Sequence, residues 1–170
     1  MKKIILLLLV FNIMAGHSQT NKNTSAKIAL QKSLVGDWQL VSVINIYPDQ
    51  NRVYPYGDAP QGKLIFDDKG NYALQIYRAL RTNVVSGDKN KCTPEENAAM
   101  VQGSNAHFGK YLVNETDHTI TFNIEQASFP NWNMTSQKRS YTYTGTEFKY
   151  VVTHTTQGGQ AVVAEVTWKR

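Results

Sequence analysis

The chain is poor in the residues that mark several common classes of small protein. It has one cysteine, Cys92, so no disulfide can form within the chain. Its five prolines and eleven glycines are too few for a collagen-like or low-complexity protein. Charged residues make up only 18% of the chain against 41% hydrophobic residues, a balance that excludes an intrinsically disordered protein. A folded protein with one hydrophobic core is the class that remains.

Several catalytic and binding signatures are also missing. The sequence contains no Gly-x-Ser-x-Gly motif, no glycine-rich phosphate loop and no His-Glu-x-x-His motif. Its four histidines do not have the spacing of zinc ligands. The acidic pair Asp67-Asp68 is typical of a turn, and Glu95-Glu96 is typical of a helix start, so neither pair indicates a catalytic dyad. We therefore predict neither a metal nor another cofactor.

The amino terminus has the pattern of a secretory signal peptide. Lys2 and Lys3 precede an apolar run of about twelve residues, which is too short to span a bilayer. Gly16 and Ser18 are small residues suited to cleavage before Gln19. The style of this signal indicates a Gram-negative bacterium, with the protein periplasmic or secreted. We predict a signal peptide, a polar leader and a folded domain at residues 1–18, 19–33 and 34–170.

From Leu34 onward the sequence has the pattern of short antiparallel strands. Apolar and polar residues alternate with a period of two, and turn residues interrupt the alternation about every ten residues. The turn at 67–70 places a glycine where a left-handed conformation is needed, so the strands on either side are expected to form a hairpin. The predicted strands are 34–43, 62–66, 71–78, 107–114, 119–126, 137–144, 147–154 and 161–169.

One segment has clear helix signals. Thr93 can cap a helix, Pro94 suits the first helical position, and Glu96 can complete a capping box. Glycine ends the pattern at Gly103, so we predict a short helix from Pro94 to about Gln102.

The alternation also assigns a face to each side chain. Lysine and glutamate are rarely buried without a partner, so they mark the outward face of each strand. In the first strand, Trp38, Leu40 and Ile44 share one face. The other inward positions are mostly bulky: Leu64, Phe66, Tyr72, Leu74, Ile76, Arg78, His107, Tyr111, Val113, Gln137, Arg139, Tyr141, Tyr143, Phe148, Tyr150, Val152, Val162, Val166 and Trp168. An all-β, eight-stranded antiparallel up-and-down barrel with one short helix accommodates this pattern and leaves no exposed sheet edge.

Several segments resemble one known family in the same order along the chain. They are 34–42 with its Gly-x-Trp opening, 53–57, 62–66, 70–72, 93–96, 108–111 and the Phe-Pro-Asn-Trp element at 129–132, followed by Gln137 and Arg139. These segments are similar to the bacterial and fungal lipocalin-like domain family, and the resemblance extends from Leu34 to Arg170. It implies an up-and-down barrel with an internal hydrophobic pocket, and it implies no single activity.

Inward polar side chains are the candidate site residues, because a buried polar group must be paired or used. Arg78 and Arg139 either bind backbone carbonyls at an end of the barrel or hold a ligand carboxylate bidentately. His107, Tyr111 and Tyr141 form either a hydrogen-bonded core cluster or a polar contact for a ligand. Trp132, just after a proline, is expected on a loop near a barrel end, where it covers or plugs the pocket.

Three functions remain open. We favour a binding protein for a small, mostly apolar molecule, which carries a carboxylate if an arginine holds it. The alternative is an isomerase or cyclase in which His107 or Tyr111 moves a proton, and a third is a scaffold with a filled interior. The net charge of +5 is small and the basic residues are dispersed, so we expect no nucleic-acid partner and no stable membrane insertion.

Overall fold

The computed structural model describes residues 31–170, except for the side chains of His154 and Thr156. The predicted signal peptide and nearly all of the predicted leader therefore lie outside the described residues. The strands are β1 (Gly36–Ile46), β2 (Arg52–Val53), β3 (Gln61–Phe66), β4 (Asn71–Tyr77), β5 (Ser104–Asn114), β6 (Thr119–Ala127), β7 (Ser136–Tyr143), β8 (Glu147–Gln157) and β9 (Gln160–Lys169). The helical segments are residues 31–34, η1 (Lys89–Lys91), α2 (Pro94–Gln102) and η2 (Pro130–Trp132).

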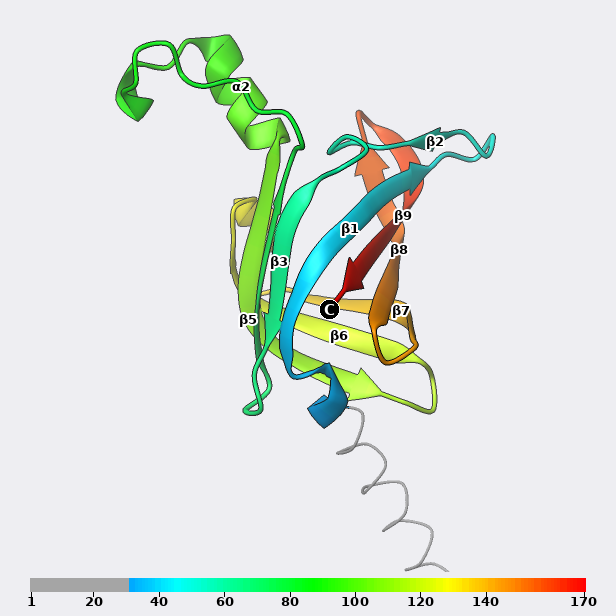
Figure 1. Cartoon of the computed structure of the whole chain (residues 1–170). Coiled ribbons are helices and arrows are strands. Elements are labelled where there is room, and N and C mark those ends of the chain that lie inside the picture. The colour runs from blue at the N-terminus through cyan, green and yellow to red at the C-terminus, as the bar shows by residue number, and fades with distance from the viewer. Residues whose placement is uncertain (1–30) are drawn as a thin grey trace, which may run out of the picture.

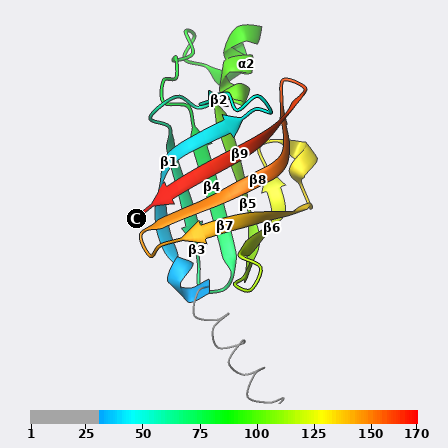
Figure 2. The same cartoon turned by 90° about the vertical axis from the view of Figure 1, so that its right-hand side faces the viewer.

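Eight of these strands form a closed antiparallel barrel (Figure 1). From β3 to β9 each strand pairs with the next along the chain, and β1 closes the ring by pairing with both β3 and β9. The wall made by β7, β8, β9 and β1 is seen face-on in Figure 2. The two-residue strand β2 is an addition that pairs only with the end of β1. The predicted eight-stranded up-and-down barrel is confirmed.

The turns that connect the strands follow the predicted chemistry. Gly70 has a positive φ of 83° in the β3–β4 hairpin, which glycine adopts without steric cost. Gly158 and Gly159 have φ values of 57° and 83° in the β8–β9 hairpin, as a tight two-residue turn between twisted strands requires.

The prediction for the later part of the first strand was wrong. A β-bulge between Leu40 and Ser42 inserts one residue into β1 relative to β9, so the alternation reverses after it. Val43 and Asn45 therefore point inward, each 5% exposed. Ile44, which the sequence pattern placed inside, pairs with Glu165 and is only half-buried.

The predicted helix is confirmed, and it belongs to an arm that projects from the barrel. We call residues 78–103, between β4 and β5, the arm (Figure 1). Thr93 and Glu96 make the capping box of α2, yet α2 has no buried residue. Within residues 31–170, no helix combines the length and the apolar character needed to cross a membrane.

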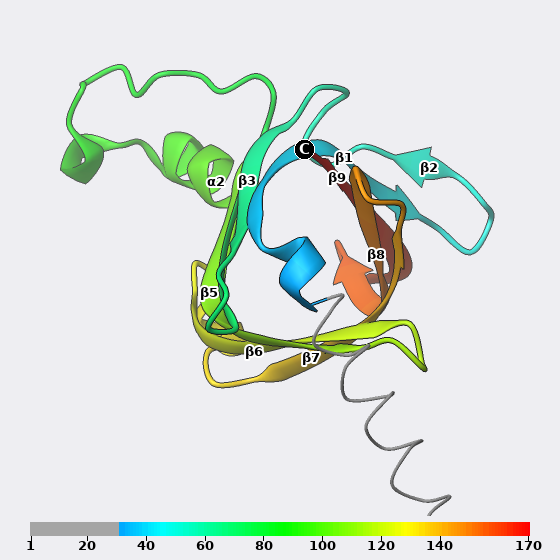
Figure 3. The same ribbon diagram turned by 60° about the horizontal axis from the view of Figure 1, so that its bottom comes forward.

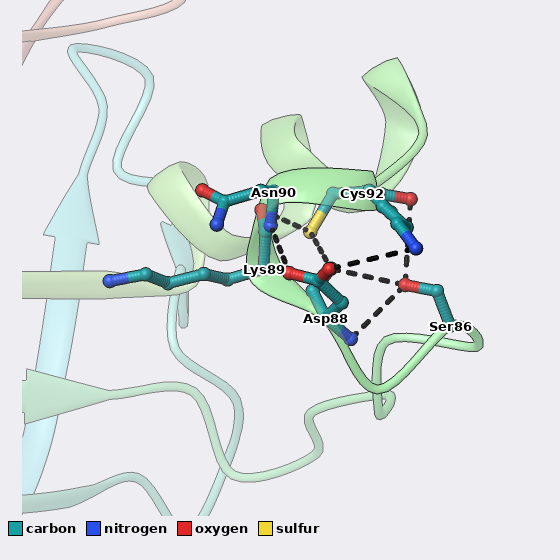
Figure 4. Close-up of polar contacts among 6 residues, drawn as sticks. Ser86, Asp88, Lys89, Asn90 and Cys92 are labelled. Carbon is teal, nitrogen blue, oxygen red and sulfur yellow. Dashed lines mark hydrogen bonds and ion pairs between the residues drawn. The ribbon is translucent and has the colours of Figure 1, made fainter.

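The tip of the arm is held by its own polar contacts, and Cys92 is part of them (Figure 4). The Oγ of Ser86 donates to the carbonyl of Asp88, and the Asp88 carboxylate accepts from the backbone N–H of Asn90. The Sγ of Cys92 lies 3.2 Å from the carbonyl oxygen of Lys89. The thiol therefore contributes to a local turn of the chain.

One end of the barrel is filled with aromatic side chains. Trp38, Phe66, Tyr111, Phe148 and Trp168 are each at most 1% exposed, and their rings pack against one another and their neighbours at centroid distances from 4.4 Å. Residues 31–34 lie across this end (Figure 3). The Nε1 of Trp38 donates to the carbonyl of Leu34 at 2.8 Å, which holds that helical turn in place.

Candidate functional site

The opposite half of the barrel contains a cavity of about 800 Å³. Its walls come from the later part of β1, the ends of β4, β5, β7, β8 and β9 that lie away from the filled end, the β2–β3 loop, the β6–β7 connection with η2, and the end of α2. Apolar walls include Val43, Ile76, Val152, Val162, Ala164 and Val166. A cavity of this size with a mainly apolar wall and a few polar groups is typical of a small-molecule site.

Arg139 lies on β7 and is only 5% exposed. Its guanidinium carbon lies 4.9 Å from the ring centre of Phe122 and 4.7 Å from that of Tyr150, so two aromatic faces support the cation. Its Nη2 donates to Oε1 of Gln137. Its Nε has no hydrogen-bond partner, and no carboxylate forms an ion pair with it, within the part of the chain that the structure describes.

His107 lines the same cavity from β5 and is 3% exposed. Its Nδ1 lies 2.8 Å from the hydroxyl of Tyr72, which stands on the neighbouring strand β4. Burial, with a smaller effect from the charge of Arg139, lowers the pKa of His107 to about 3. The imidazole is therefore neutral at neutral pH, and burial raises the pKa of Tyr72, which keeps its proton.

Arg78 lies at the rim of the cavity, directly after β4, and is half-buried. Its Nη2 donates to the carbonyl of Pro55 at 3.3 Å, and its backbone N–H donates to the carbonyl of Gly103 at 2.8 Å. These bonds tie the loop before β3 to both ends of the arm. One predicted interpretation, an arginine that binds backbone carbonyls at a barrel end, describes this residue well.

Trp132 lies on η2, between β6 and β7, and lines the cavity. Its ring is edge-on to His107 and to Phe129, with centroid distances of 6.1 Å and 5.6 Å. The side chain is half-buried, so it forms part of the wall near the mouth. The loop position expected from the preceding proline is confirmed.

Tyr111 and Tyr141 do not line the cavity, although they share its inward parity. The hydroxyl of Tyr111 donates to the carbonyl of Asp67 at 3.2 Å in the filled half, where burial and the Asp67 charge raise its pKa to about 12. Tyr141 packs against Phe148 and His118 at the same end. A ligand role for either tyrosine stays a prediction, and the cavity gives it no support.

Gln137 and Asn45 line the cavity and Tyr72 contacts His107, and the sequence did not single out any of the three as a candidate site residue. Inward parity marked Tyr72 and Gln137, but nothing in the pattern distinguished them from core residues. Asn45 was hidden by the bulge in β1; it is 5% exposed and its Nδ2 lies 3.4 Å from Oε1 of Gln157.

The charged side chains that line the cavity are positive. Among the described residues that line it, Arg78 and Arg139 are the charged side chains. No aspartate, glutamate or lysine is among these residues. Within residues 31–170 no group of three or more His, Cys, Asp or Glu side chains is placed to hold a metal ion. The cavity is therefore suited to an anionic group attached to an apolar body.

Comparison with known families agrees with this architecture. The family model for the lipocalin-like domain matches residues 35–170. The chain belongs to the lipocalin-like domain family. The closed barrel of this chain is a fold suited to binding a small molecule in the interior. No curated protein matches the chain significantly.

Proposed function

We propose that this lipocalin-like protein binds a small, mostly apolar carboxylic acid, with the carboxylate at Arg139. The observation that carries the proposal is a buried guanidinium that faces the cavity with Nε unpartnered and no carboxylate opposite it among the described residues. Charged side chains are rarely buried without a partner. Nε itself is fully enclosed, so a ligand carboxylate meets the guanidinium at its η nitrogens, and the planar group can bind a carboxylate through two parallel hydrogen bonds.

The shape of the cavity gives the ligand an orientation. Arg139 and Tyr150 lie in the middle of the barrel, next to the filled half, whereas Arg78, Trp132 and the end of α2 lie at the mouth. A carboxylate at Arg139 is therefore buried, and the apolar body extends along the aliphatic wall toward Trp132. Burial of that body supplies roughly 25 cal/mol per Å² of apolar surface removed from water.

The isomerase or cyclase alternative is less well supported. A general base works best when its pKa lies near the working pH. The pKa of His107 is lowered to about 3, so the neutral imidazole is a weak base. Tyr111, the other predicted proton-transfer group, lies in the filled half. Turnover of a bound molecule during incubation is the result that would favour the enzyme.

Decanoic acid and methyl decanoate test the proposal, because they differ in the carboxylate alone. For Arg139→Met we expect the affinity for decanoic acid to fall about ten- to more than a hundredfold, equivalent to about 1.5–3 kcal/mol for a hydrogen bond to a charged group. The affinity for the ester should change little. Trp132 is the tryptophan that lines the cavity, so its fluorescence reports binding, and Trp132→Phe is the control for that signal.

Arg78→Met is the matched control for the position of the charge. Its guanidinium already binds the carbonyl of Pro55, so we expect a smaller loss of affinity than for Arg139→Met. Loss of acid binding in Arg78→Met alone would move the carboxylate to the mouth. Equal binding of acid and ester by the wild type would contradict the proposal.

We also propose that the protein is exported after cleavage of residues 1–18. The support is the sequence pattern: two lysines, a short apolar run and small residues before Gln19. Mass spectrometry of protein recovered from the periplasm or medium should find an amino terminus close to Gln19. Recovery of chains that retain Met1 would contradict export by cleavage.

A further inference from the structure

We propose that the ligand carries a neutral oxygen, as a hydroxyl or carbonyl group, close to its carboxylate, and that this oxygen accepts a hydrogen bond from Nε2 of His107. The inference rests on the proposed function, because it names the ligand class for the same cavity. It is carried by the His107–Tyr72 pair and by the position of that pair relative to Arg139.

His107 is a buried polar side chain with one ring nitrogen occupied and the other available. The side chain is 3% exposed and lines the cavity. Its Nδ1 is bound to Tyr72 at 2.8 Å, whereas Nε2 makes no hydrogen bond within the part of the chain that the structure describes. Nε2 is not among the fully enclosed polar atoms, so it is accessible from the cavity, where an acceptor on a ligand can reach it.

The hydrogen bond to Tyr72 fixes which nitrogen carries the proton. The Tyr72 side chain is 4% exposed, and among the described residues its hydroxyl has no acceptor other than Nδ1 of His107. We therefore assign the bond as Tyr72 O–H donating to Nδ1, because the reverse assignment leaves a buried hydroxyl proton unsatisfied. The imidazole proton then resides on Nε2, and Nε2–H is a donor.

The neutral state of His107 determines what it recognises. Burial and the neighbouring Arg139 keep the imidazole uncharged. The ionised guanidinium can bind a carboxylate through two parallel hydrogen bonds, so we assign the carboxylate to Arg139 and leave Nε2–H for a second oxygen of the ligand. Nε2–H is therefore matched to a neutral acceptor, such as a hydroxyl or carbonyl oxygen.

The geometry around Phe122 places this oxygen near the carboxylate. The imidazole and the Phe122 ring are edge-on with their centroids 6.0 Å apart, and the Arg139 guanidinium carbon lies 4.9 Å from the same ring centre. Both donors therefore lie around one ring, and the charge of Arg139 acts on the imidazole, so the carboxyl end of one ligand can meet both donors. Hydroxy acids and keto acids substituted near the carboxyl end fit this arrangement.

Four probes test the position of the oxygen: decanoic acid and its hydroxyl derivatives at the β, δ and ω carbons. For the wild type we expect the β- or δ-hydroxy acid to bind roughly three- to tenfold more tightly than decanoic acid, the range for one neutral hydrogen bond. The ω-hydroxy acid should show no gain. In His107→Phe, the affinity ratio between the favoured hydroxy acid and decanoic acid should fall to about one.

Two further variants complete the test. Tyr72→Phe keeps the imidazole but removes the hydroxyl that fixes its tautomer, so the ratio should fall there too, even if His107→Phe does not fold. His118→Asn alters an exposed histidine at the filled end and should leave the ratio intact. A ratio near one in the wild type, or one unchanged in both His107→Phe and Tyr72→Phe, overturns this inference and leaves the proposed function standing. Failure of all four acids to bind overturns both.

Discussion

Two arginines in different halves of the barrel illustrate how one residue type can be placed in two environments. Arg170, in the filled half, lies 4.5 Å from the ring centre of Trp38 and donates to the Tyr143 hydroxyl and to two backbone carbonyls. Arg139, in the cavity half, also lies over aromatic rings, yet its Nε has no partner among the described residues. The first arginine is satisfied by the fold. The second has room for the ligand carboxylate that we propose.

The same contrast holds for the two halves as a whole. In the filled half, the hydroxyl groups of Tyr111 and Tyr143 donate to backbone carbonyls, and Trp38 Nε1 does the same. In the cavity half, buried polar nitrogens face an aliphatic space. Folding free energy is therefore expected to come mainly from the filled half, and binding specificity from the cavity half.

The largest effect is expected in the filled half. Trp38 is fully buried and its Nε1 binds the carbonyl of Leu34. We expect Trp38→Ala to lower the free energy of unfolding by about 3–5 kcal/mol through lost burial and a cavity. Val162→Ala, a smaller truncation on the cavity wall, should cost about 1 kcal/mol. Urea unfolding measures both, and equal losses would contradict the division into halves.

The stability of the protein should depend on pH through the protonation of His107. Its pKa is lowered in the folded state, so the unfolded chain takes up the proton first as the pH falls below 6.5. The stabilising effect of keeping His107 neutral is present above that pH and is lost progressively toward pH 3. Between pH 7 and pH 5 we expect a loss of about 2 kcal/mol, measured by urea unfolding.

His107→Phe is the control for this pH dependence, because it removes the titrating group and keeps an aromatic ring. The variant should lose little stability between pH 7 and pH 5. The pKa values of the Asp67 and Glu96 carboxyl groups are lowered, so their contributions to stability change mainly below pH 5. A variant that retains the full pH dependence would remove His107 as its cause.

Replacement of the two arginines by methionine should affect different properties: Arg170→Met should reduce stability, and Arg139→Met should reduce ligand affinity. Arg170→Met should lower the free energy of unfolding by about 1–2 kcal/mol, from the lost hydrogen bonds and the contact with Trp38, without changing affinity for decanoic acid. Arg139→Met should lower affinity and change stability by less than about 1 kcal/mol, because the cost of burying a charge is removed together with the contacts to Phe122, Tyr150 and Gln137. Thermal unfolding and titration of both variants check this; a large stability loss in Arg139→Met would make that arginine structural.

The sequence predicted the barrel because its signals are local. Alternation, turn glycines and the Thr93 capping box each depend on neighbouring residues, and the structure confirms them. The bulge between Leu40 and Ser42 was not predicted, since it depends on how β1 registers against β9, far along the chain. As a result Ile44 was placed inside and Asn45 was missed.

The site was harder to predict. Alternation shows which face of the sheet a side chain lies on, but it does not show how far along the barrel axis that side chain lies. His107 and Tyr111 share one face of β5, but only His107 reaches the cavity. The contact between Tyr72 and His107 joins two strands, and no spacing in the sequence encodes it. Arg139 was found because a buried cation is conspicuous in any strand pattern.

The ionisation of a bound carboxyl group tests the central claim most directly. Decanoic acid labelled with carbon-13 at the carboxyl carbon reports its own protonation by NMR in the complex. If Arg139 holds the carboxylate, the pKa of the bound acid should lie below that of the free acid, because a nearby opposite charge favours the ionised form. In Arg139→Met burial should raise that pKa above the value for the free acid. A raised pKa in the wild-type complex would contradict the assignment of Arg139 as the carboxylate partner.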